Sequence, residues 1–512
     1  MDILSLPEFE LLYKKILSES LASIPMSLLI APMVNNHSVD LYSQMISGLS
    51  VSTQIIVASA IKKILEKMDY EFRIAPDRIQ RYYVKNRRER TIITIFGEVR
   101  YWRTEYIDRT TKKPFIYVDE EIGLIRRQRY DSVVAAMAYE QYSHQVAMAE
   151  VGKNLGRMIS GFRLDADREK YDISRQQIFN MINRFSSIQT ASPLDRETPD
   201  TLYIMADEKF IHLQQEMEEW RQDCRDKGYT EKDITAMEKN KHFSEMVKLA
   251  VVFTAREQEF NKDGKSLKTP RWKLKDTYYM AFPHDSKRFW ECVADELAKI
   301  YDMNKVKRIY ILGDGAEWIK AGASELTTQH CKVKFALDRY HLAKAIRTIS
   351  KDDKYIDRMT DYIVHGDKES FMAMVNSLYA DEEMTTAAQN AVKYIQNQMG
   401  AAVIMQSEVK IGCAMEQAIS HVLAAVFTCI PKAYVSDHLH TYVQARINYK
   451  NHQDLIRLYI SACDASKDSE KLYEKESAVD LSKENLDFSI FDLKSSTPYY
   501  HANLDSVMKK RY

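Results

Sequence analysis

Two short apolar runs that each end in an aspartate constrain this chain more than any other feature of its sequence. Ile309–Leu312 leads into Gly313 and Asp314, and Val333–Leu337 leads into Asp338. Apolar runs of this length fit buried parallel strands better than helices. A carboxylate at the carboxyl end of such a strand opens into the crevice where open α/β sheets bind ligands. We therefore expect a site at this edge of a sheet.

The sequence upstream predicts the rest of that sheet. Thr201–Ala206 is a third β-prone run that ends in an acid, Asp207. Residues 246–257 and 276–283 predict two more strands, and 289–301 predicts an amphipathic helix. This order matches the ribonuclease-H-like fold of DDE recombinases. We expect an α/β protein with a mixed five-stranded sheet, flanking helices and a long helical insertion, preceded by helical and small β DNA-binding modules.

Such a set of carboxylates predicts metal-dependent phosphoryl chemistry. Two divalent cations about 4 Å apart can bridge a scissile phosphate, one activating the nucleophilic oxygen and one stabilising the leaving oxygen. Mg²⁺ prefers oxygen ligands, and Mn²⁺ could replace it. Asp207 and Asp314 would share two Mg²⁺ ions, and a third acid would come from a later helix. Spacing alone leaves that acid open among Glu317, Glu325, Glu369, Glu408 and Glu416.

A basic segment near the front predicts contact with DNA. Residues 81–129 carry 13 basic and 7 acidic side chains, in contrast to an acidic stretch at 464–494, and the whole chain has no net charge. The segment predicts two strands around a turn at Gly97 and a third over Pro114–Val118. Cations beside aromatic rings suit a nucleic-acid backbone, although a solvated small sheet would look similar. The candidate contacts are Arg87, Arg88, Arg90, Arg100 and Arg103.

The next segment predicts a helical unit that could read DNA. Asp131–Leu155 has the pattern of one long helix. Ser174 with Gln177 three residues later forms a capping box at the start of another helix. Arg175 and Gln176 would then be exposed and suited to groove contacts. An ordinary helical hairpin fits the same pattern.

These signals divide the chain into seven regions. Scattered cysteines favour a reducing compartment, and we expect no signal peptide or membrane span, hence a cytoplasmic, nucleoid-associated protein. The expected regions are an N-terminal helical region opened by an amphipathic segment at 7–12 (1–78), a small basic β module (79–129), a helix-turn-helix-like region with a linker near 192–200 (130–195), the first segment of the catalytic core (200–350), a helical insertion (351–405), the second core segment with the final acid (406–465) and a polar tail (466–512).

Most of the chain resembles the ISLre-type (Lre-two) insertion-sequence transposases, a bacterial DDE group with a helical insertion before the last acid. The more specific matching motifs are Asp314-Gly-Ala-Glu-Trp-Ile and Asp338-Arg-Tyr-His341. Weaker matches are Arg90-Thr-Ile, Phe96-Gly-Glu-Val, Ala206-Asp207, Gly412-Cys-Ala-Met-Glu416 and Ser420-His-Val-Leu. The resemblance implies that Asp207, Asp314 and Glu416 are the metal-binding catalytic triad, with Asp338 and His341 as an accessory pair.

The resemblance also implies the activity and its partners. A transposase of an insertion sequence cuts and joins DNA strands at its own terminal repeats, and assembly on two ends implies a homodimer or a larger oligomer. The sequence departs from the family at Gln417 and at Phe427–Pro431, where relatives carry a glycine and a cationic stretch. A catalytically inactive, transposase-derived DNA-binding protein is therefore an alternative. A carboxylate-pair glycosidase is a further one, but it would leave the basic front segment unexplained.

Overall fold

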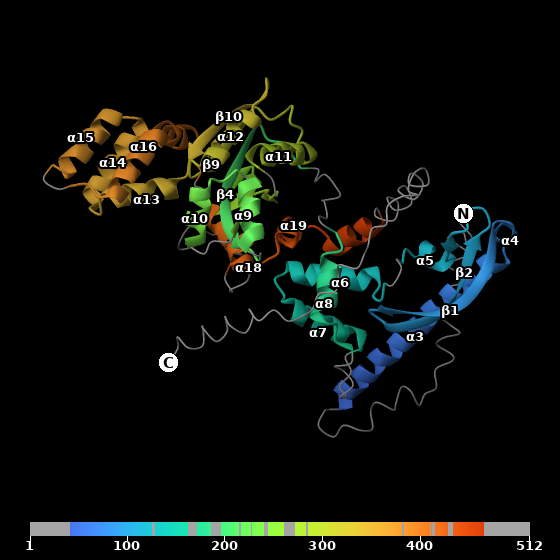
Figure 1. Cartoon of the computed structure of the whole chain (residues 1–512). Helices are drawn as coiled ribbons and strands as arrows, with labels where there is room; N and C mark the ends of the chain where they lie inside the picture. Colours follow the sequence, from blue (N-terminus) through green and yellow to red (C-terminus); the bar gives the residue numbers. More distant parts are fainter. Residues whose placement is uncertain are drawn as a thin grey trace. The chain divides into compact units, whose positions relative to one another are not determined.

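The structure is a computed structural model of the 512-residue chain. It describes residues 41–464, except for 125–127, 162–170, 186–195, 215–216, 227, 240–243, 261–271, 283–284, 381–382, 410, 412–414 and 429–433. The amphipathic segment at 7–12, the beginning of the linker near 192–200 and the polar tail lie outside the described residues. The described chain has many helices and a five-stranded mixed sheet (Figure 1).

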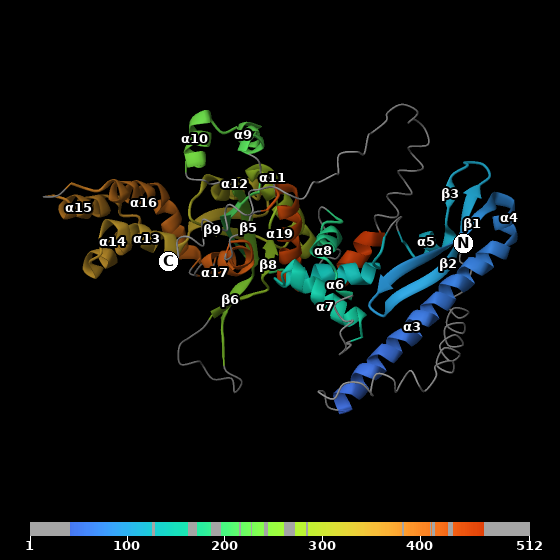
Figure 2. The ribbon, with the colours of Figure 1, turned by 60° about the horizontal axis from the view of Figure 1, so that its bottom comes forward.

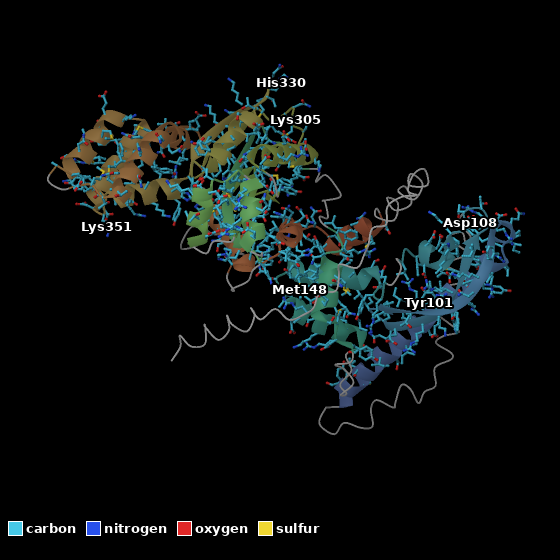
Figure 3. The ribbon with its side chains drawn as sticks, viewed as in Figure 1. Tyr101, Asp108, Met148, Lys305, His330 and Lys351 are labelled. Atoms are coloured by element: carbon cyan, nitrogen blue, oxygen red, sulfur yellow. The ribbon has the colours of Figure 1, made fainter. Side chains whose placement is uncertain are left out.

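The basic segment forms the predicted small β module. β1 (Tyr82–Thr94) and β2 (Gly97–Asp108) pair antiparallel around the turn at Gly97, and a short β3 (Pro114–Phe115) adds to β2. The third strand is shorter than expected, because the chain turns into helix α5 (Tyr117–Glu121). Figure 3 labels the buried Tyr101 and Asp108 in this module.

A long helix, α3 (Leu41–Ile74), closes the free edge of β2 before α4 (Pro76–Arg81) leads into β1. The Glu66 and Asp69 carboxylates accept hydrogen bonds from the backbone N–H groups of Trp102 and Thr104, at 3.0 and 2.7 Å. Side-chain acceptors thus replace a neighbouring strand there. By length and composition, Met45–Ile74 could also cross a membrane, contrary to our expectation of no such segment. The hydrogen bonds from β2 to Glu66 and Asp69 fit a helix packed within a module.

The helical unit contains three short helices in place of one long helix and a partner. They are α6 (Ser132–Ser143), α7 (Met148–Ile159) and α8 (Arg175–Ile182), each packed against the other two. The predicted helix over Asp131–Leu155 is interrupted at Gln145, whose φ of 74° is incompatible with a right-handed helix. The predicted N-cap is confirmed, because the Ser174 hydroxyl accepts from the Gln177 N–H at 3.4 Å. The Gln177 side chain accepts instead from the Tyr130 hydroxyl at 3.1 Å, so the second bond expected of a capping box is replaced.

The central sheet has the strand order β10-β9-β4-β5-β8. Its strands are β4 (Thr201–His212), β5 (Ser244–Phe253), β8 (Tyr278–Met280), β9 (Arg308–Gly313) and β10 (Lys332–Leu337). β9 is parallel to β4 and β10, while β5 is antiparallel to β4 and β8. The two apolar runs form the parallel strands β9 and β10, as expected, and β9 is buried. β10 is instead an edge strand, in which only Ala336 and Leu337 are buried.

Helices cover both faces of this sheet. One face, with Leu202, Ile204 and Ala206 of β4, packs against α11 (Ser286–Ile300) and α12 (Glu317–Glu325). The opposite face, with Met205, packs within a second core built largely from helices later in the chain. These are α13 (Arg339–Ile349), α14 (Asp353–His365), α15 (Lys368–Leu378), α16 (Thr386–Ile404), η3 (Met405–Val409), α17 (Met415–Ile419), η4 (Ser420–Ala424), α18 (Ala425–Phe427), α19 (Ser436–Lys450) and a helical run over 455–464.

Two insertions leave the sheet. The charged excursion after β4 forms a helical pair, α9 (Met217–Asp226) and α10 (Glu231–Lys239), which packs around Trp220 and Ile234. After β5, β6 (Ala255–Gln258) and β7 (Trp272–Lys275) form a separate two-stranded hairpin. Figure 2 shows β6 extending away from the five-stranded sheet.

Candidate functional site

Strand register places three aspartates on one line across the sheet. Met205 on β4 pairs with Leu312 on β9, so the chain positions of Asp207 and Asp314 fall side by side two residues further on. Leu337 on β10 pairs with Gly313, and the Asp338 N–H donates to the Gly313 carbonyl at 2.9 Å. Because side chains alternate along a strand, Asp207 lies on the same face as Met205, the face that the later helices cover.

Asp207 lies in the middle of its strand, and our expectation that it ends the strand is wrong. β4 continues to His212 because β5 pairs with it over its whole length beyond Asp207, as far as Ser244. Asp314 directly follows β9, and Asp338 directly follows β10, as expected. Asp207 therefore lies just past the last residue of β4 that pairs with β9, level with the two strand ends.

Local hydrogen bonds fix the backbone at two of these aspartates. Asp314 accepts from the Ala316 N–H at 2.8 Å, which closes the turn into α12. Asp338 is the N-cap of α13 and accepts from the Tyr340 N–H at 3.0 Å. Its second carboxylate oxygen lies 3.1 Å from Nδ1 of His341. Asp338 is 3% exposed, so both of these contacts are buried and help to hold the start of α13 in place.

His341 joins the aspartates to Glu416. Its Nδ1 faces Asp338, and its Nε2 lies 4.0 Å from Oε1 of Glu416. α17, which carries Glu416, packs against β4 and β5. The hydrogen bond to Asp338 raises the pKa of His341, burial opposes this, and the charges of Asp338, Asp314 and Asp207 raise it further. The structure thus links Asp338 to Glu416 through His341 and places Asp207 and Asp314 near enough to His341 for their charges to raise its pKa.

The carboxylates influence one another electrostatically. Burial raises the pKa of Asp207 to about 6, and the neighbouring charges of Glu208 and Asp314 add to the rise. Burial also raises the pKa of Glu208, again with a contribution from Asp314. Glu208 accepts a hydrogen bond from the indole N–H of Trp318 at 2.7 Å. The strand that carries Asp207 is thereby tied to the helix that follows Asp314.

Two of the other candidates for the third acid, Glu408 and Glu317, pair with residues outside the line of aspartates. Glu408 accepts from Lys334 at 2.7 Å and from the Tyr310 hydroxyl at 2.9 Å, near the start of β9 and β10. The Glu317 side chain is 91% exposed and pairs with Lys320. Within the described residues these two acids thus have partners other than His341, in contrast to Glu416. The Glu416 side chain is 56% exposed, so it could move toward a ligand.

Helix α16 of the insertion supports the turn that carries Asp314. The Tyr394 hydroxyl donates to the Asp314 carbonyl at 2.5 Å, and Nε2 of Gln398 donates to the Gly315 carbonyl at 3.3 Å. Gly315 has a φ of 95°, and a Cβ there would lie 2.5 Å from Gln398 Nε2. The sequence did not single out Glu208, Tyr394 or Gln398, because nothing local in it signals a contact across such separations.

The donor set fits Mg²⁺ in its chemistry. Asp207 and Asp314 offer oxygen ligands, and Mg²⁺ is commonly held by one or two carboxylates together with water and substrate phosphates. Among the described residues, no three His, Cys, Asp or Glu side chains form a group that could hold a metal ion by themselves. An ion here would therefore depend on phosphate oxygens or on movement of Glu416.

The predicted DNA-binding arginines fall into two classes. Arg90 is 8% exposed, and both it and Arg103 pair with Asp119 of α5. The guanidinium groups of Arg90 and Arg103 are therefore ion-pair partners of Asp119 within the module, and our expectation that they contact DNA is wrong. Arg87, Arg88 and Arg100 are exposed on β1 and β2. Arg88 reaches Glu105 at 3.4 Å and Arg100 reaches Glu98 at 2.9 Å, while Arg87 stacks on the Trp102 ring.

The helical unit presents its candidates as the sequence predicts. Arg175 and Gln176 are exposed in the first turn of α8. Gln176 donates to the side chain of Asn180 at 3.1 Å, one turn further along the same exposed face. The buried face of α8, with Ile178 and Ile182, packs in the core. An exposed polar helix face beside a packed bundle is compatible with groove binding and equally with a solvated surface.

Among solved structures, the chain is similar to the Drosophila P element transposase strand transfer complex. The similarity covers 69% of this chain and 82% of that chain, at 14% sequence identity and a TM-score of 0.23. A TM-score this low carries no argument about fold or function. Curated relatives give a clearer relationship.

These relatives come from Caldanaerobacter subterraneus subsp. tengcongensis. UPF0236 protein TTE2489 is 27% identical over 423 residues, which are 81% of this chain and 79% of the relative. UPF0236 protein TTE0402 is also 27% identical over 423 residues, covering 75% of its own length. The model of the uncharacterised protein family UPF0236 matches residues 40–459. This chain therefore belongs to the uncharacterised protein family UPF0236.

Proposed function

We propose that this protein is a DNA transposase of a bacterial insertion sequence, with a ribonuclease-H-like core. The observation that carries the proposal is the line of Asp207, Asp314 and Asp338 across β4, β9 and β10, facing Glu416 through His341. Carboxylates gathered at one edge of a sheet suit metal-assisted phosphodiester hydrolysis and transesterification. Double-stranded DNA, including the terminal repeats of the element and a target site, would be the substrate.

Asp207 and Asp314 would hold the metal ions, with Glu416 as the third ligand. Bound Mg²⁺ would lower the pKa of the attacking oxygen's proton and stabilise charge on the leaving oxygen. The chain's own residues supply the positioning. Asp338 orients His341, and His341 faces the Glu416 carboxylate. The bond between Trp318 and Glu208 links β4 to α12 and so keeps Asp207 and Asp314 in register.

The exposed cations are proposed to grip the DNA. Arg87, Arg88 and Arg100 on the β module would contact phosphates, and Arg175 and Gln176 on α8 would reach a groove. Synapsis of two element ends would require a homodimer or a larger assembly. A DNA substrate would place the protein with the nucleoid in the cytoplasm. The seven regions expected from the sequence serve in this scheme as the DNA-binding modules, the catalytic core and its insertion.

The test is cleavage of the element's own terminal repeats by the purified full chain. We expect nicking that depends on Mg²⁺ or Mn²⁺ and disappears in Asp314→Asn, which keeps the shape of the side chain but removes its charge. Glu325→Gln is the matched control, because Glu325 is an exposed acid at the far end of α12. Binding of the ends without any nicking by the wild type would instead establish the inactive DNA-binding protein, which the departures at Gln417 and Phe427–Pro431 favour.

A further inference from the structure

Two of the five tryptophans in this chain are exposed, and both carry an arginine over the ring. Trp220, Trp290 and Trp318 are at most 8% exposed, whereas Trp102 is 43% and Trp272 is 51% exposed. The Arg87 guanidinium carbon lies 5.8 Å from the Trp102 ring centroid. The Arg256 guanidinium carbon lies 5.2 Å from the Trp272 ring centroid. Both pairs stand on antiparallel hairpins.

The pair of Arg256 and Trp272 lies outside every site described above. Its hairpin leaves β5 after Phe253, which pairs with Tyr203. Asp207 pairs with Leu249, four residues earlier on β5, so the hairpin leaves the sheet at the end away from the carboxylates. At about 3.3 Å per residue, its base is more than about 13 Å from Asp207 along the strand. A ligand held there would not be at the scissile position.

One face of the hairpin combines an aromatic ring, a cation and an amide. Gln258 pairs with Trp272, and Arg256 pairs with Leu274, so these four side chains share a face by strand alternation. Leu274 is partly buried against the main core, which anchors the hairpin. Trp272, Arg256 and Gln258 remain for a ligand. This face has no acidic residue on either described strand.

The acidic side chain of β6 lies on the other face. Glu257 pairs with Lys273 in the register, and its carboxylate lies 3.6 Å from Nζ of Lys275. The two described strands together carry three basic side chains, Arg256, Lys273 and Lys275, and one acidic side chain, Glu257. The net charge of these two strands therefore favours an anionic ligand. A flat ring beside a guanidinium and an amide is suited to a base with its phosphate.

We propose that Trp272, with Arg256 and Gln258, forms a stacking site for unpaired DNA bases. Duplex DNA keeps its bases stacked on one another, so the ring can accept a base only from a single-stranded or opened segment. The inference rests on the proposed function in taking DNA as the ligand. It adds a single-strand contact remote from the carboxylates, which would hold a displaced strand or an opened target.

The experiment measures the fluorescence anisotropy of two labelled DNAs with the full chain at one salt concentration. The probes are an oligothymidine of about 20 nucleotides, which cannot pair with itself, and a duplex of equal length. We expect Trp272→Ala to weaken oligothymidine binding about tenfold, with duplex binding changed less than about twofold. Trp272→Phe should restore most of the affinity, and Arg256→Ala should weaken it by less than Trp272→Ala does.

Tyr229→Ala is the matched control, because Tyr229 is 46% exposed on another insertion and has no cation over its ring among the described contacts. It should leave both affinities unchanged. Thermal unfolding of each variant shows whether a loss of binding comes from a loss of folding. If Trp272→Ala unfolds at a lower temperature than the wild type, the oligothymidine affinities of Trp272→Phe and Arg256→Ala decide whether the stacking site exists. Equal oligothymidine affinity in Trp272→Ala and wild type overturns the inference. So does an equal loss for both DNAs, or a loss of self-association in sedimentation.

The two proposals can fail separately. Trp272-dependent binding of oligothymidine by a protein that never nicks the terminal repeats would support the stacking site and overturn the transposase activity. Metal-dependent nicking by a protein whose affinity for oligothymidine is unchanged in Trp272→Ala would support the transposase activity and overturn the stacking site. A wild type that binds neither DNA would overturn both.

Discussion

The hydroxyl of Tyr394, in the helical insertion, donates a hydrogen bond to the backbone carbonyl of Asp314, which follows strand β9 of the five-stranded sheet. The two residues are 80 positions apart in the chain. The insertion therefore does more than lengthen the chain between two acids. Through α16 it fixes the turn from which one of the candidate metal ligands projects.

Tyr394→Phe tests this link. Loss of the bond leaves a part-buried carbonyl without its partner, so we expect a fall of about 1–2 kcal/mol in the free energy of unfolding. Because this bond holds the turn that carries Asp314, metal-dependent nicking by Tyr394→Phe should fall by more than the increase in the unfolded fraction of that variant can explain. Tyr379→Phe is the control, since the Tyr379 hydroxyl donates to the Ile349 carbonyl at 2.7 Å within the same group of helices. Equal losses of nicking in the two variants would contradict the prediction.

Gly315→Ala separates backbone strain from packing at the same turn. Gly315 has a positive φ, and a Cβ there would overlap Gln398, which is 6% exposed and cannot easily move away. Gly228 also has a positive φ, of 83°, but nothing lies within 4 Å of its Cβ position. We expect urea unfolding to show a loss of about 1 kcal/mol for Gly228→Ala and about 2–4 kcal/mol for Gly315→Ala. Combining Gly315→Ala with Gln398→Ala should recover part of the stability that Gly315→Ala loses. If the double variant recovers none of it, overlap with the Gln398 side chain is not the cause of the loss.

The strands of the fold could be predicted from the sequence, whereas the contacts that hold the site could not. Runs such as Ile309–Leu312 are long enough for one buried strand and too short for a helix, so strand identity and order followed from local pattern. The end of β4 did not, because it is set by pairing with β5, across an inserted helical pair. The break at Gln145 was equally hidden, since no glycine or proline stands between α6 and α7 to mark it.

The site shows the same division. Asp207, Asp314 and Asp338 could be selected because each follows or ends an apolar run, and register then brings them into line. The bond between Trp318 and Glu208 spans 110 residues and has no local signature. Arg90 and Arg103 looked like DNA-binding cations because the sequence does not show that Asp119 folds back against them.

Asp119→Asn should destabilise the β module. Its carboxylate faces two largely buried guanidinium groups, Arg90 and Arg103, and burial lowers the pKa of both. Removal of the charge would leave two cations without their counter-ion, for which we expect about 3–5 kcal/mol in chemical denaturation. Glu98→Gln removes a partner from the exposed Arg100 and should change stability by less than about 1 kcal/mol. Similar effects for both substitutions would refute the structural role of Asp119.

Arg87→Ala should affect DNA binding rather than stability. Arg87 is exposed, and no carboxylate among the described residues lies within ion-pair distance of it, so its charge is available to a phosphate. We expect weaker duplex binding and a salt dependence of log Kd that is shallower by about one phosphate contact. Arg88→Ala should have a smaller effect, because Glu105 already pairs with Arg88. An unchanged salt slope in Arg87→Ala would remove this residue from the DNA surface.

Asp131 predicts a measurable pH dependence of stability away from the candidate site. It is the N-cap of α6 and accepts from the Val134 N–H at 2.7 Å, and burial raises its pKa from 3.8 to about 6. A carboxyl whose pKa is higher in the folded state stabilises the fold fully below its unfolded value. That contribution is lost as pH rises through the folded value.

Asp131→Asn keeps the cap and removes the charge. Its stability relative to the wild type should therefore increase between about pH 4 and pH 6, and exceed the wild type by about 1–3 kcal/mol at pH 7. Asp367→Asn, at the exposed N-cap of α15, is the control and should show no such rise, because hydrogen bonds from Ser370 lower the pKa of the Asp367 carboxyl. Urea unfolding of the three proteins across this pH range measures the difference. A gap between Asp131→Asn and wild type that stays constant with pH would mean that the Asp131 carboxyl does not titrate in this range.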